Sequence, residues 1–307
     1  MRKKIALIGA GNVGATLALF VAQKELGDIA LVDLNGDMAK GKALDIMQAG
    51  AVMGFDTRIT ASDDFSIIQD AEIVAVTAGF PRKPGMDRIE LLHKNRDIID
   101  SIAANIKKFA PNSMVIVVSN PVDVMTYRMW EQTGFDKAKV MGQAGVLDTG
   151  RMITFLGEKT GYNVKDIHGM VLGGHGDTMV PVFSFTRLQG APITEILDQN
   201  TLDKIGTRTQ KGGGEIVGLL KTGSAYYAPA AATAIMIEAI IKDEKRILPV
   251  SCYPKNKEYG IDGLYIGLPA VLGSEGVEKI IEFNLTDSEK EKLHNSANIY
   301  QKSIADL

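Results

Sequence analysis

The sequence contains very little cysteine, and Cys252 is its one thiol among 307 residues. No disulfide can therefore form within the chain, and a single thiol fits a reducing compartment better than the extracellular space. We accordingly expect a cytoplasmic protein. Histidine is also scarce, and no group of histidine, cysteine and acidic residues has the spacing of a metal site, so we expect no bound metal.

Long apolar runs are absent as well, and no stretch of the sequence reaches the length of a membrane-spanning helix. The nearest candidate, residues 228–241, contains Glu238. Basic residues at 2–4 precede an apolar run, as in a signal peptide, but Gly9 interrupts that run early, and we interpret it as a first strand. A net charge of −3 gives no reason to expect a nucleic-acid partner.

What the sequence does contain is a normal globular mixture, with 45% hydrophobic and 23% charged residues. In the first half, short apolar runs alternate with segments of helical length. The expected strands are residues 4–8, 29–33, 73–77 and 114–119, and the expected helices are residues 13–24, 38–52 and 87–109. Continuous valine and isoleucine runs alternating with helices predict an α/β fold with a Rossmann-type, doubly wound parallel sheet.

The second half has a different pattern. We expect strands near residues 167–172 and 180–185, a helical stretch over about 201–241, and two antiparallel strands at 247–253 and 264–272. A capping box at Thr286 and Glu289 opens a closing helix, which we interpret as structural. These features predict two domains, a Rossmann domain over residues 1–144 and a mixed α+β substrate domain over residues 145–307.

A glycine-rich turn directly follows the first expected strand and opens the first expected helix. It consists of Gly9, Ala10, Gly11, Asn12, Val13 and Gly14. Such a turn lets the backbone approach a pyrophosphate at a helix N-terminus. Asp33 ends the next strand, where its carboxylate would bind a ribose and repel a 2′-phosphate. The pattern predicts NAD rather than NADP, the alternative being a glycine turn with an incidental surface aspartate.

Among the four histidines, His175 differs in lying within the run Gly173-Gly174-His175-Gly176-Asp177 between two expected strands. A loop of so little bulk can bring an imidazole close to a substrate, and histidine suits acid–base chemistry near neutral pH. Asp148 is the candidate to fix its tautomer. Arg151 follows on the same helical face and could hold a carboxylate, although an ordinary surface ion pair between the two explains the spacing equally well.

Two further segments suggest binding. Ser119-Asn120-Pro121 ends the fourth strand, where ligands bind in open α/β sheets, although a simple turn is the alternative there. Residues 79–88 form a loop rich in glycine and proline that contains Arg82 and Arg88. It could close on an anion and exclude water, or it could be a solvated basic loop.

Taken in order along the chain, these motifs resemble the lactate/malate dehydrogenase superfamily, specifically its lactate-dehydrogenase-like malate dehydrogenases. The resemblance spans nearly the whole chain. Its motifs are the glycine turn, Asp33, the basic loop, Ser119-Asn120-Pro121-Val122-Asp123, Leu147-Asp148-Thr149-Gly150-Arg151 and Gly174-His175-Gly176-Asp177. It implies NAD-dependent, reversible oxidation of (S)-malate, a small dicarboxylate, to oxaloacetate.

The resemblance also implies roles for particular residues. His175 would be the catalytic acid and base, with Asp148 as its partner. Arg151 would bind the carboxylate next to the reacting carbon, and Arg88 would polarise the substrate carbonyl. Arg82 occupies the position where lactate dehydrogenases have glutamine, and it would bind the second carboxylate of oxaloacetate.

The remaining implied roles concern the rim of the site. Asn120 would bind both substrate and cofactor. Asn95 and the backbone of Val118, Ser119 and Asn120 would contact NAD, and Ser224 would lie near the substrate side chain. The resemblance and the apolar stretches at 43–52 and 228–241 favour a homodimer or homotetramer, although both stretches could instead be buried inside one subunit.

Three alternatives stay open. One is a lactate or other 2-hydroxy-acid dehydrogenase. Another is an NAD-using glycoside hydrolase, which would need cysteine and histidine metal ligands. The third is a non-catalytic NAD-binding protein, which we would expect to lack part of the catalytic set. NADH oxidation assayed with oxaloacetate, with pyruvate and without substrate separates them.

Overall fold

The computed structural model describes residues 2–80 and 88–307, with the side chains of residues 88 and 89 excepted. Its first half forms a parallel sheet with the strand order β3-β2-β1-β4-β5-β6. This is the order of a doubly wound nucleotide-binding sheet. The strands are β1 (Lys4–Ile8), β2 (Asp28–Val32), β3 (Ile59–Ser62), β4 (Ile73–Val76), β5 (Met114–Val117) and β6 (Val140–Gly142).

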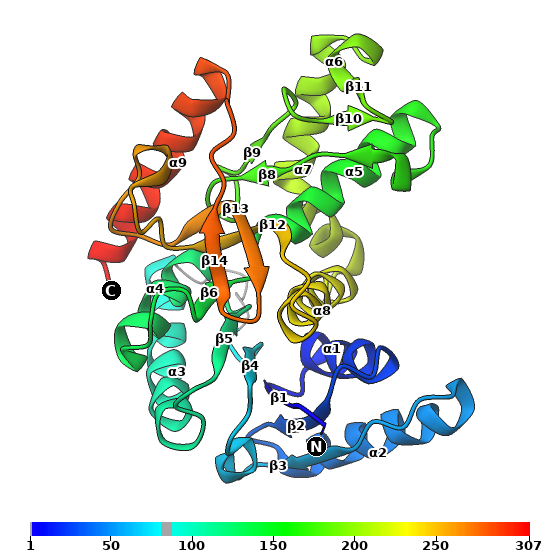
Figure 1. Cartoon of the computed structure of the whole chain (residues 1–307), viewed down its shortest axis with the longest axis vertical. Coiled ribbons are helices and arrows are strands. Elements are labelled where there is room, and N and C mark those ends of the chain that lie inside the picture. The colour runs from blue at the N-terminus through cyan, green and yellow to red at the C-terminus, as the bar shows by residue number, and fades with distance from the viewer. Residues whose placement is uncertain (1, 81–87) are drawn as a thin grey trace.

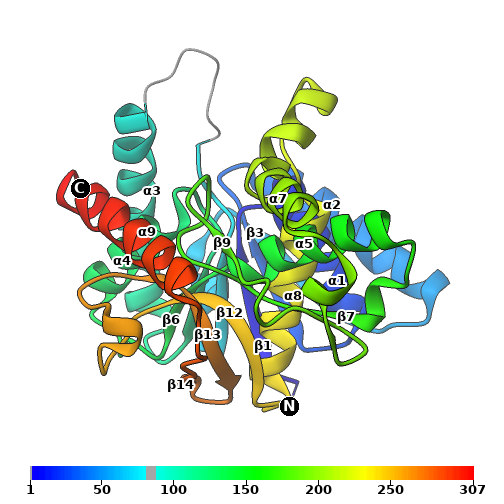
Figure 2. The ribbon, with the colours of Figure 1, turned by 90° about the horizontal axis from the view of Figure 1, so that it is seen from above.

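Helices cover both faces of this sheet because successive strand residues point to opposite sides. Ile5 and Leu7 of β1 pack in one core cluster, whereas Ala6 and Ile8 pack in another. Figure 2 shows α3 and α4 on one side of the sheet and α1, α2 and α8 on the other. The helices of this half are α1 (Asn12–Gln23), α2 (Gly36–Met53), α3 (Arg88–Phe109) and α4 (Val122–Thr133).

The second half adds antiparallel strands to the same sheet and helices around it (Figure 1). β12 pairs antiparallel with β6 and with β13, which in turn pairs with β14. The expected fold class is therefore confirmed. The elements are α5 (Gly145–Thr160), β7 (Ile167–His168), β8 (Val171–Leu172), β9 (Val180–Pro181), β10 (Arg187–Leu188), β11 (Ala191–Pro192), α6 (Ile193–Ile196), α7 (Gln199–Leu220), α8 (Tyr227–Ile241), β12 (Arg246–Cys252), β13 (Ile266–Gly273), β14 (Gly276–Ile280) and α9 (Asp287–Ala305).

The expected helical stretch over 201–241 is wrong in one respect, because the chain breaks it into α7 and α8. Lys221 has a φ of 63° and Gly223 a φ of 91°, neither of which a helix allows. Pro229 lies in the first turn of α8, where its missing N–H needs no partner and its ring meets no preceding helical turn. Proline and glycine thus set the start of α8.

The expected strand at 167–172 is also two strands in two different sheets. β7 pairs with β10, whereas β8 pairs with β9. The expected strand at 180–185 is reduced to the two residues of β9. The result is a short hairpin of β8 and β9, whose connecting loop contains His175.

The expected closing helix is α9, and both halves of its capping box are present. Thr286 accepts a hydrogen bond from the Glu289 backbone, and the Glu289 side chain accepts one from the Thr286 backbone. α9 lies against α4 (Figure 2). In the described part of the chain, no helix is both long and apolar enough to cross a membrane.

Candidate active site

The glycine turn lies at the point where the sheet order reverses, between β1 and β4. Gly9 has a φ of 106°, and a Cβ built on it would lie 2.7 Å from Oγ1 of Thr77. A Cβ on Gly14 would lie only 1.8 Å from the carbonyl oxygen of Gly9. The turn therefore needs glycine at both positions to pack helix α1 closely against the end of β1.

The space next to Gly11 of the turn is open. A Cβ on Gly11 would meet no atom within 4 Å, and no side chain caps the N-terminus of α1. Gly11 and Asn12 are exposed, and Val13 is half-buried. The first backbone N–H groups of a helix need partners from outside it, and a phosphate is a suitable one. The turn thus fits a pyrophosphate.

Asp33 follows β2 directly and is fixed on the rim of this turn. Its Oδ2 accepts a hydrogen bond from the Ala10 backbone at 2.7 Å, and its Oδ1 accepts one from the Asn35 backbone at 2.9 Å. Nζ of Lys42 donates to the Ala10 carbonyl at 2.6 Å. Lys42, for which the sequence predicted no role, is thus a cation that α2 places on this turn.

His175 and Asp148 are brought together across two elements. Asp148 lies in the first turn of α5, and its Oδ2 is 2.8 Å from Nδ1 of His175 in the loop after β8. Oδ1 of Asp148 accepts a hydrogen bond from Nη1 of Arg151 at 3.0 Å. Asp148 is 2% exposed and the His175 side chain 16%. An ionised carboxylate only accepts hydrogen bonds, so this contact places a proton on Nδ1 and leaves Nε2 as the ring nitrogen that can accept a proton.

Opposing influences act on the protonation of His175. Burial is the largest and lowers its pKa, and Arg151 also lowers it. The charge and hydrogen bond of Asp148, together with the charge of Asp123, outweigh them, so the pKa of His175 is raised above 6.5. The imidazolium form is therefore stabilised in place.

Arg151 lies between Asp148 and α7. A Cβ on Gly212 would be 3.1 Å from Cδ of Arg151, and a Cβ on Gly213 would be 3.4 Å from its Nη2. Consecutive glycines are costly within a helix, and here they give room to the guanidinium. Nε of Arg151 is buried and has no hydrogen-bond partner among the described residues. The guanidinium therefore keeps a donor that a substrate carboxylate could use.

The ends of β4 and β5 are joined by a buried amide. Asn95, only 1% exposed, accepts a hydrogen bond from the Phe80 backbone at 2.6 Å and donates to the Asn120 carbonyl at 2.7 Å. Ser119 donates through its hydroxyl to the Ala78 carbonyl. Val118 is half-buried, and Asn120 is exposed at the carboxyl edge of the sheet. The Asn95 amide thus binds the protein's own backbone, and its contact with NAD stays a prediction.

Three expected site residues are not placed beside His175. Arg82 lies outside the described residues, and Arg88 begins α3 with a side chain that is likewise outside them. Ser224 is exposed in the connection between α7 and α8. Among the described residues, it makes no hydrogen bond to His175 or Arg151.

One contact of the site was not foreseen. Asp123, in the first turn of α4, accepts a hydrogen bond from the His175 backbone at 2.8 Å. Its burial raises its pKa to about 6, against hydrogen bonds from Ser251 and His175 that lower it. Asp123 ends the motif Ser119-Asn120-Pro121-Val122-Asp123, but the sequence predicted no role for it. An acidic residue within an apolar run, between Val122 and Val124, is the signal that could have identified it.

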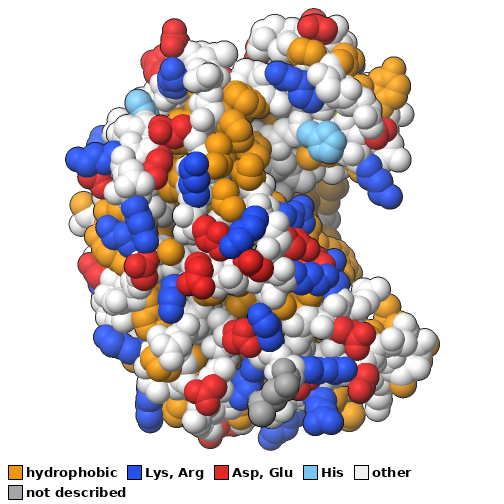
Figure 3. All heavy atoms as spheres, in the orientation of Figure 1, with side chains coloured by type: hydrophobic (Ala, Val, Ile, Leu, Met, Phe, Trp, Pro, Cys, Tyr) orange, Lys and Arg blue, Asp and Glu red, His pale blue; other side chains and the backbone are white. Residues whose placement is uncertain are grey.

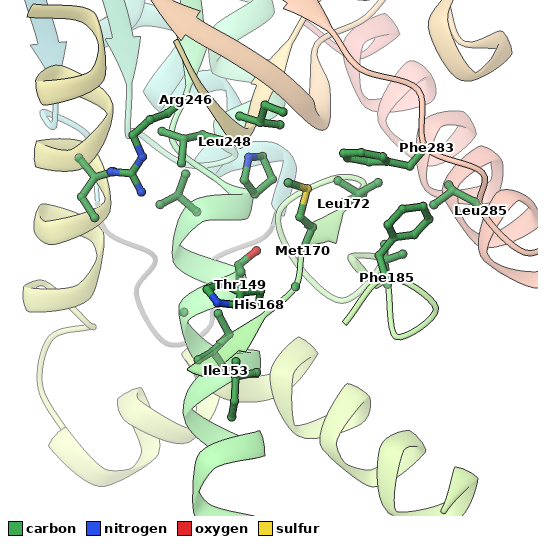
Figure 4. Close-up of a pocket in the computed structure, with 18 residues that line it drawn as sticks. Thr149, Ile153, His168, Met170, Leu172, Phe185, Arg246, Leu248, Phe283 and Leu285 are labelled. Atoms are coloured by element: carbon green, nitrogen blue, oxygen red, sulfur yellow. The ribbon is translucent and has the colours of Figure 1, made fainter. Parts of the chain in front are cut away.

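A separate apolar hollow of about 440 Å³ lies between α5, β12 and the segment before α9. Figure 4 shows the rings of Phe185 and Phe283 on one side of it and the guanidinium of Arg246 on the other. His168 also lines it, without a carboxylate among the lining residues. The described residues contain no group of three or more histidine, cysteine and acidic side chains that could hold a metal ion. The hollow lacks the acid–base pair found at His175.

Comparisons with known proteins agree with this geometry. The family model described as the NAD binding domain of lactate/malate dehydrogenase matches residues 3–142, and the model of the α/β C-terminal domain of that family matches residues 145–307. Malate dehydrogenase of Rhodopirellula baltica is 53% identical over 100% of this chain and 98% of its own. Malate dehydrogenase of Roseiflexus sp. is 50% identical over 100% and 99%.

Solved structures give the same result. The malate dehydrogenase of Cryptosporidium parvum has a TM-score of 0.97 at 39% identity, over 100% of this chain and 99% of its own. The lactate dehydrogenase of Cryptosporidium parvum, complexed with lactic acid and nicotinamide adenine dinucleotide, has a TM-score of 0.96 at 38% identity over the same shares. The expected resemblance is confirmed, and the chain belongs to the lactate/malate dehydrogenase family.

Proposed function

We propose that this protein is an NAD-dependent malate dehydrogenase that interconverts (S)-malate and oxaloacetate. The observation that carries the proposal is the Asp148–His175 hydrogen bond beside Arg151, because it combines an oriented acid–base group with a carboxylate-binding cation. Curated malate dehydrogenases that are 49–53% identical over the full chain support the choice of substrate.

In this proposal, Nε2 of His175 takes the hydroxyl proton of malate and returns a proton to oxaloacetate in the reverse direction. Asp148 keeps the ring in the required tautomer and stabilises the imidazolium. Arg151 binds the carboxylate next to the reacting carbon through a charge-assisted hydrogen bond. Arg88 polarises the carbonyl, and Asn120 and Ser224 complete the substrate pocket. NAD⁺, held by the glycine turn and Asp33, would supply the hydride acceptor for malate oxidation.

We assign the cofactor to the first half of the chain, within residues 1–144, and the proton carrier His175 with its partners Asp148 and Arg151 to the second half, residues 145–307, whereas the substrate contacts both halves. The open space above Gly11 and the fixed carboxylate of Asp33 support the first assignment. The backbone from Val118 to Asn120, and Asn95, complete the proposed cofactor site. Measuring kcat/KM with NADH and with NADPH side by side tests this assignment. We expect a clear preference for NADH, and equal values would show that Asp33 does not select the cofactor.

Arg82 is our candidate for binding the second carboxylate, which oxaloacetate has and pyruvate lacks. The overall fold does not separate the two substrates, since a lactate dehydrogenase aligns almost as closely as a malate dehydrogenase. A lactate or other 2-hydroxy-acid dehydrogenase is therefore the second candidate. NADH oxidation with oxaloacetate, with pyruvate and with no substrate decides between them. We expect rapid turnover with oxaloacetate, and faster turnover with pyruvate would support the alternative.

We further propose a cytoplasmic homodimer or homotetramer. The apolar stretch of α8 gives no support, because most of that helix is buried within the subunit against α1 and the sheet. α2 does support it, since this one helix exposes Leu44, Met47, Val52 and Met53. On the face shown in Figure 3, charges of both signs are dispersed over the lower half and hydrophobic side chains form a strip above them. Light scattering at micromolar concentration tests the assembly, and a monomer would contradict it.

A further inference from the structure

In the loop that contains His175, the backbone N–H and carbonyl of this residue are hydrogen-bonded to side chains. The N–H of His175 donates to Oδ2 of Asp123 at 2.8 Å, and its carbonyl accepts from the hydroxyl of Tyr300 at 2.8 Å. In the hairpin of β8 and β9, the ladder pairs Val171 with Pro181 and Leu172 with Val180, so it ends before this loop. The backbone on both sides of the imidazole is thus fixed by side chains.

Helix α9 holds the neighbouring residue in the same way. Oγ of Ser296 accepts a hydrogen bond from the Gly174 backbone at 2.9 Å and lies 2.9 Å from Oγ1 of Thr178. A Cβ on Gly174 would lie 1.8 Å from the ring of Tyr300, so only glycine permits this contact. The closing helix, which the sequence analysis interpreted as structural, therefore packs directly on the loop of His175.

Asp123 is itself held from the sheet. The hydroxyl of Ser251 on β12 donates to Oδ1 of Asp123 at 2.6 Å, which leaves Oδ2 for the His175 backbone. Asp123 is 1% exposed and Ser251 is fully buried. Burying an acidic side chain costs free energy unless its hydrogen bonds compensate. Asp123 has two such bonds, and it keeps both only when the His175 backbone stays in its present position.

We propose that Asp123 and Tyr300 are positioning residues that clamp the backbone of His175 from two sides, so that its imidazole meets Asp148 and the substrate together. This inference rests on the proposed function, in which His175 moves a proton. The hydrogen bonds of both side chains to His175 go to its backbone and not to the imidazole ring. Each acts on the position of the ring through the peptide groups that flank it, in addition to the effect of the Asp123 charge on the pKa of His175, and a displacement of about 1 Å at a catalytic group can cost ~10²-fold in rate.

Tyr300→Phe is the sharpest test, because it removes the hydroxyl and leaves the ring against Gly174. We expect kcat for oxaloacetate reduction to fall roughly ten- to a hundredfold through misplacement of the imidazole. KM for oxaloacetate should stay near wild type because Arg151 is untouched. Tyr265→Phe is the matched control, since the Tyr265 hydroxyl is buried without a partner among the described residues and lies in the aromatic cluster with Trp130. It should keep wild-type kcat.

A double-mutant cycle separates positioning from general stability. In a His175→Asn background, Tyr300→Phe should cause no further loss of the residual turnover, because there is no imidazole left to position. Asp123→Asn gives a second, independent variant if Tyr300→Phe fails to fold, with the same expected fall in kcat and, because the Asp123 charge raises the pKa of His175, a pH midpoint at lower pH. Wild-type kcat in both variants, or a fall of equal size with and without His175, would overturn the proposal.

A readout that needs no substrate distinguishes this inference from the proposed function. The Nδ1 proton shared by His175 and Asp148 should give a downfield proton resonance in the wild type and in Tyr265→Phe. We expect Tyr300→Phe to broaden or abolish it through faster exchange with water. An unchanged resonance would count against the clamp, whereas a wild type that reduces no oxaloacetate would count against malate as the substrate.

Discussion

The glycine turn and the His175 loop both depend on glycine, but they are held by residues at very different separations along the chain. In the turn, Gly14 packs on Gly9, Asp33 bonds to Ala10 across a separation of 23 residues, and Thr77 bonds to the Gly9 carbonyl across 68. The contacts of His175 come from separations of 27, 52 and 125 residues. The contacts of the turn thus lie within the first 77 residues, whereas those of the His175 site extend from Asp123 to Tyr300.

This difference has a physical basis. A phosphate is recognised by backbone N–H groups at a helix terminus, which any sequence of the right shape supplies. A proton carrier needs one side chain in one orientation, with a partner that fixes its tautomer and a backbone that cannot shift. Single substitutions should therefore affect the two regions separately, and the following predictions use that separation.

The largest effect should come from His175→Ala. Removing a general acid and base typically costs ~10²–10⁴-fold in rate, so turnover with oxaloacetate should fall by about that factor. NADH binding, measured by fluorescence titration, should stay near wild type because the glycine turn is intact. A variant with near wild-type turnover would show that another group carries the proton, and a variant that lost NADH would show that the two regions are coupled.

A somewhat smaller effect is expected from Arg82→Gln. Removing one partner of a buried, hydrogen-bonded charge pair costs about 2–5 kcal/mol. That corresponds to roughly 30- to several-thousand-fold in kcat/KM for oxaloacetate. Pyruvate reduction should rise, because its methyl group no longer faces an unpaired guanidinium.

The matched variant is Arg88→Gln, which should impair both substrates through the carbonyl that they share. The ratio of oxaloacetate to pyruvate efficiency, measured in the wild type and in both variants, is the deciding quantity. If Arg82→Gln leaves that ratio unchanged, Arg82 is a solvated residue and does not select the substrate.

The smallest effect concerns the glycines of α7. In Gly212→Ala the new Cβ would lie 3.1 Å from Cδ of Arg151, which must move by a few tenths of an ångström. We expect KM for oxaloacetate to rise roughly threefold to tenfold, since displaced binding groups lose affinity steeply. Gly214→Ala is the control, because nothing lies within 4 Å of its Cβ, and it should raise helix stability by about 1 kcal/mol without changing KM. Equal KM values in the two variants would mean that Arg151 does not depend on this helix.

The same contrast between local and distant contacts explains what the sequence could predict. β1, β2, β4 and β5 were foreseen, because continuous apolar runs such as those of β1 and β4 are typical of strands buried on both faces. β3, β6 and α4 received no prediction. β6 has only three residues, and the sequence pattern marks so short a strand weakly, since its position depends on pairing with β5 and β12.

For the site, local motifs identified the residue types, and the structure supplied the partners. The Gly-rich loop singled out His175, and helical spacing related Asp148 to Arg151. The role of Tyr300 could not be predicted, because its position on the apolar face of α9 is explained by core packing. Only the fold brings its hydroxyl to a carbonyl 125 residues away.

The central claim is that His175, with its raised pKa, carries the proton, and the pH dependence of the two reaction directions tests it most directly. Burial and Arg151 lower this pKa, but Asp148 and Asp123 raise it by more, so the pKa of His175 lies above the ordinary value of 6.5. Reduction of oxaloacetate needs protonated His175, so its kcat/KM should fall as pH rises through that raised pKa. Oxidation of malate needs neutral His175 and should rise through the same pKa. Asp148→Asn should move both midpoints to lower pH, whereas midpoints unmoved by Asp148→Asn, or the same pH trend in both directions, would contradict the account.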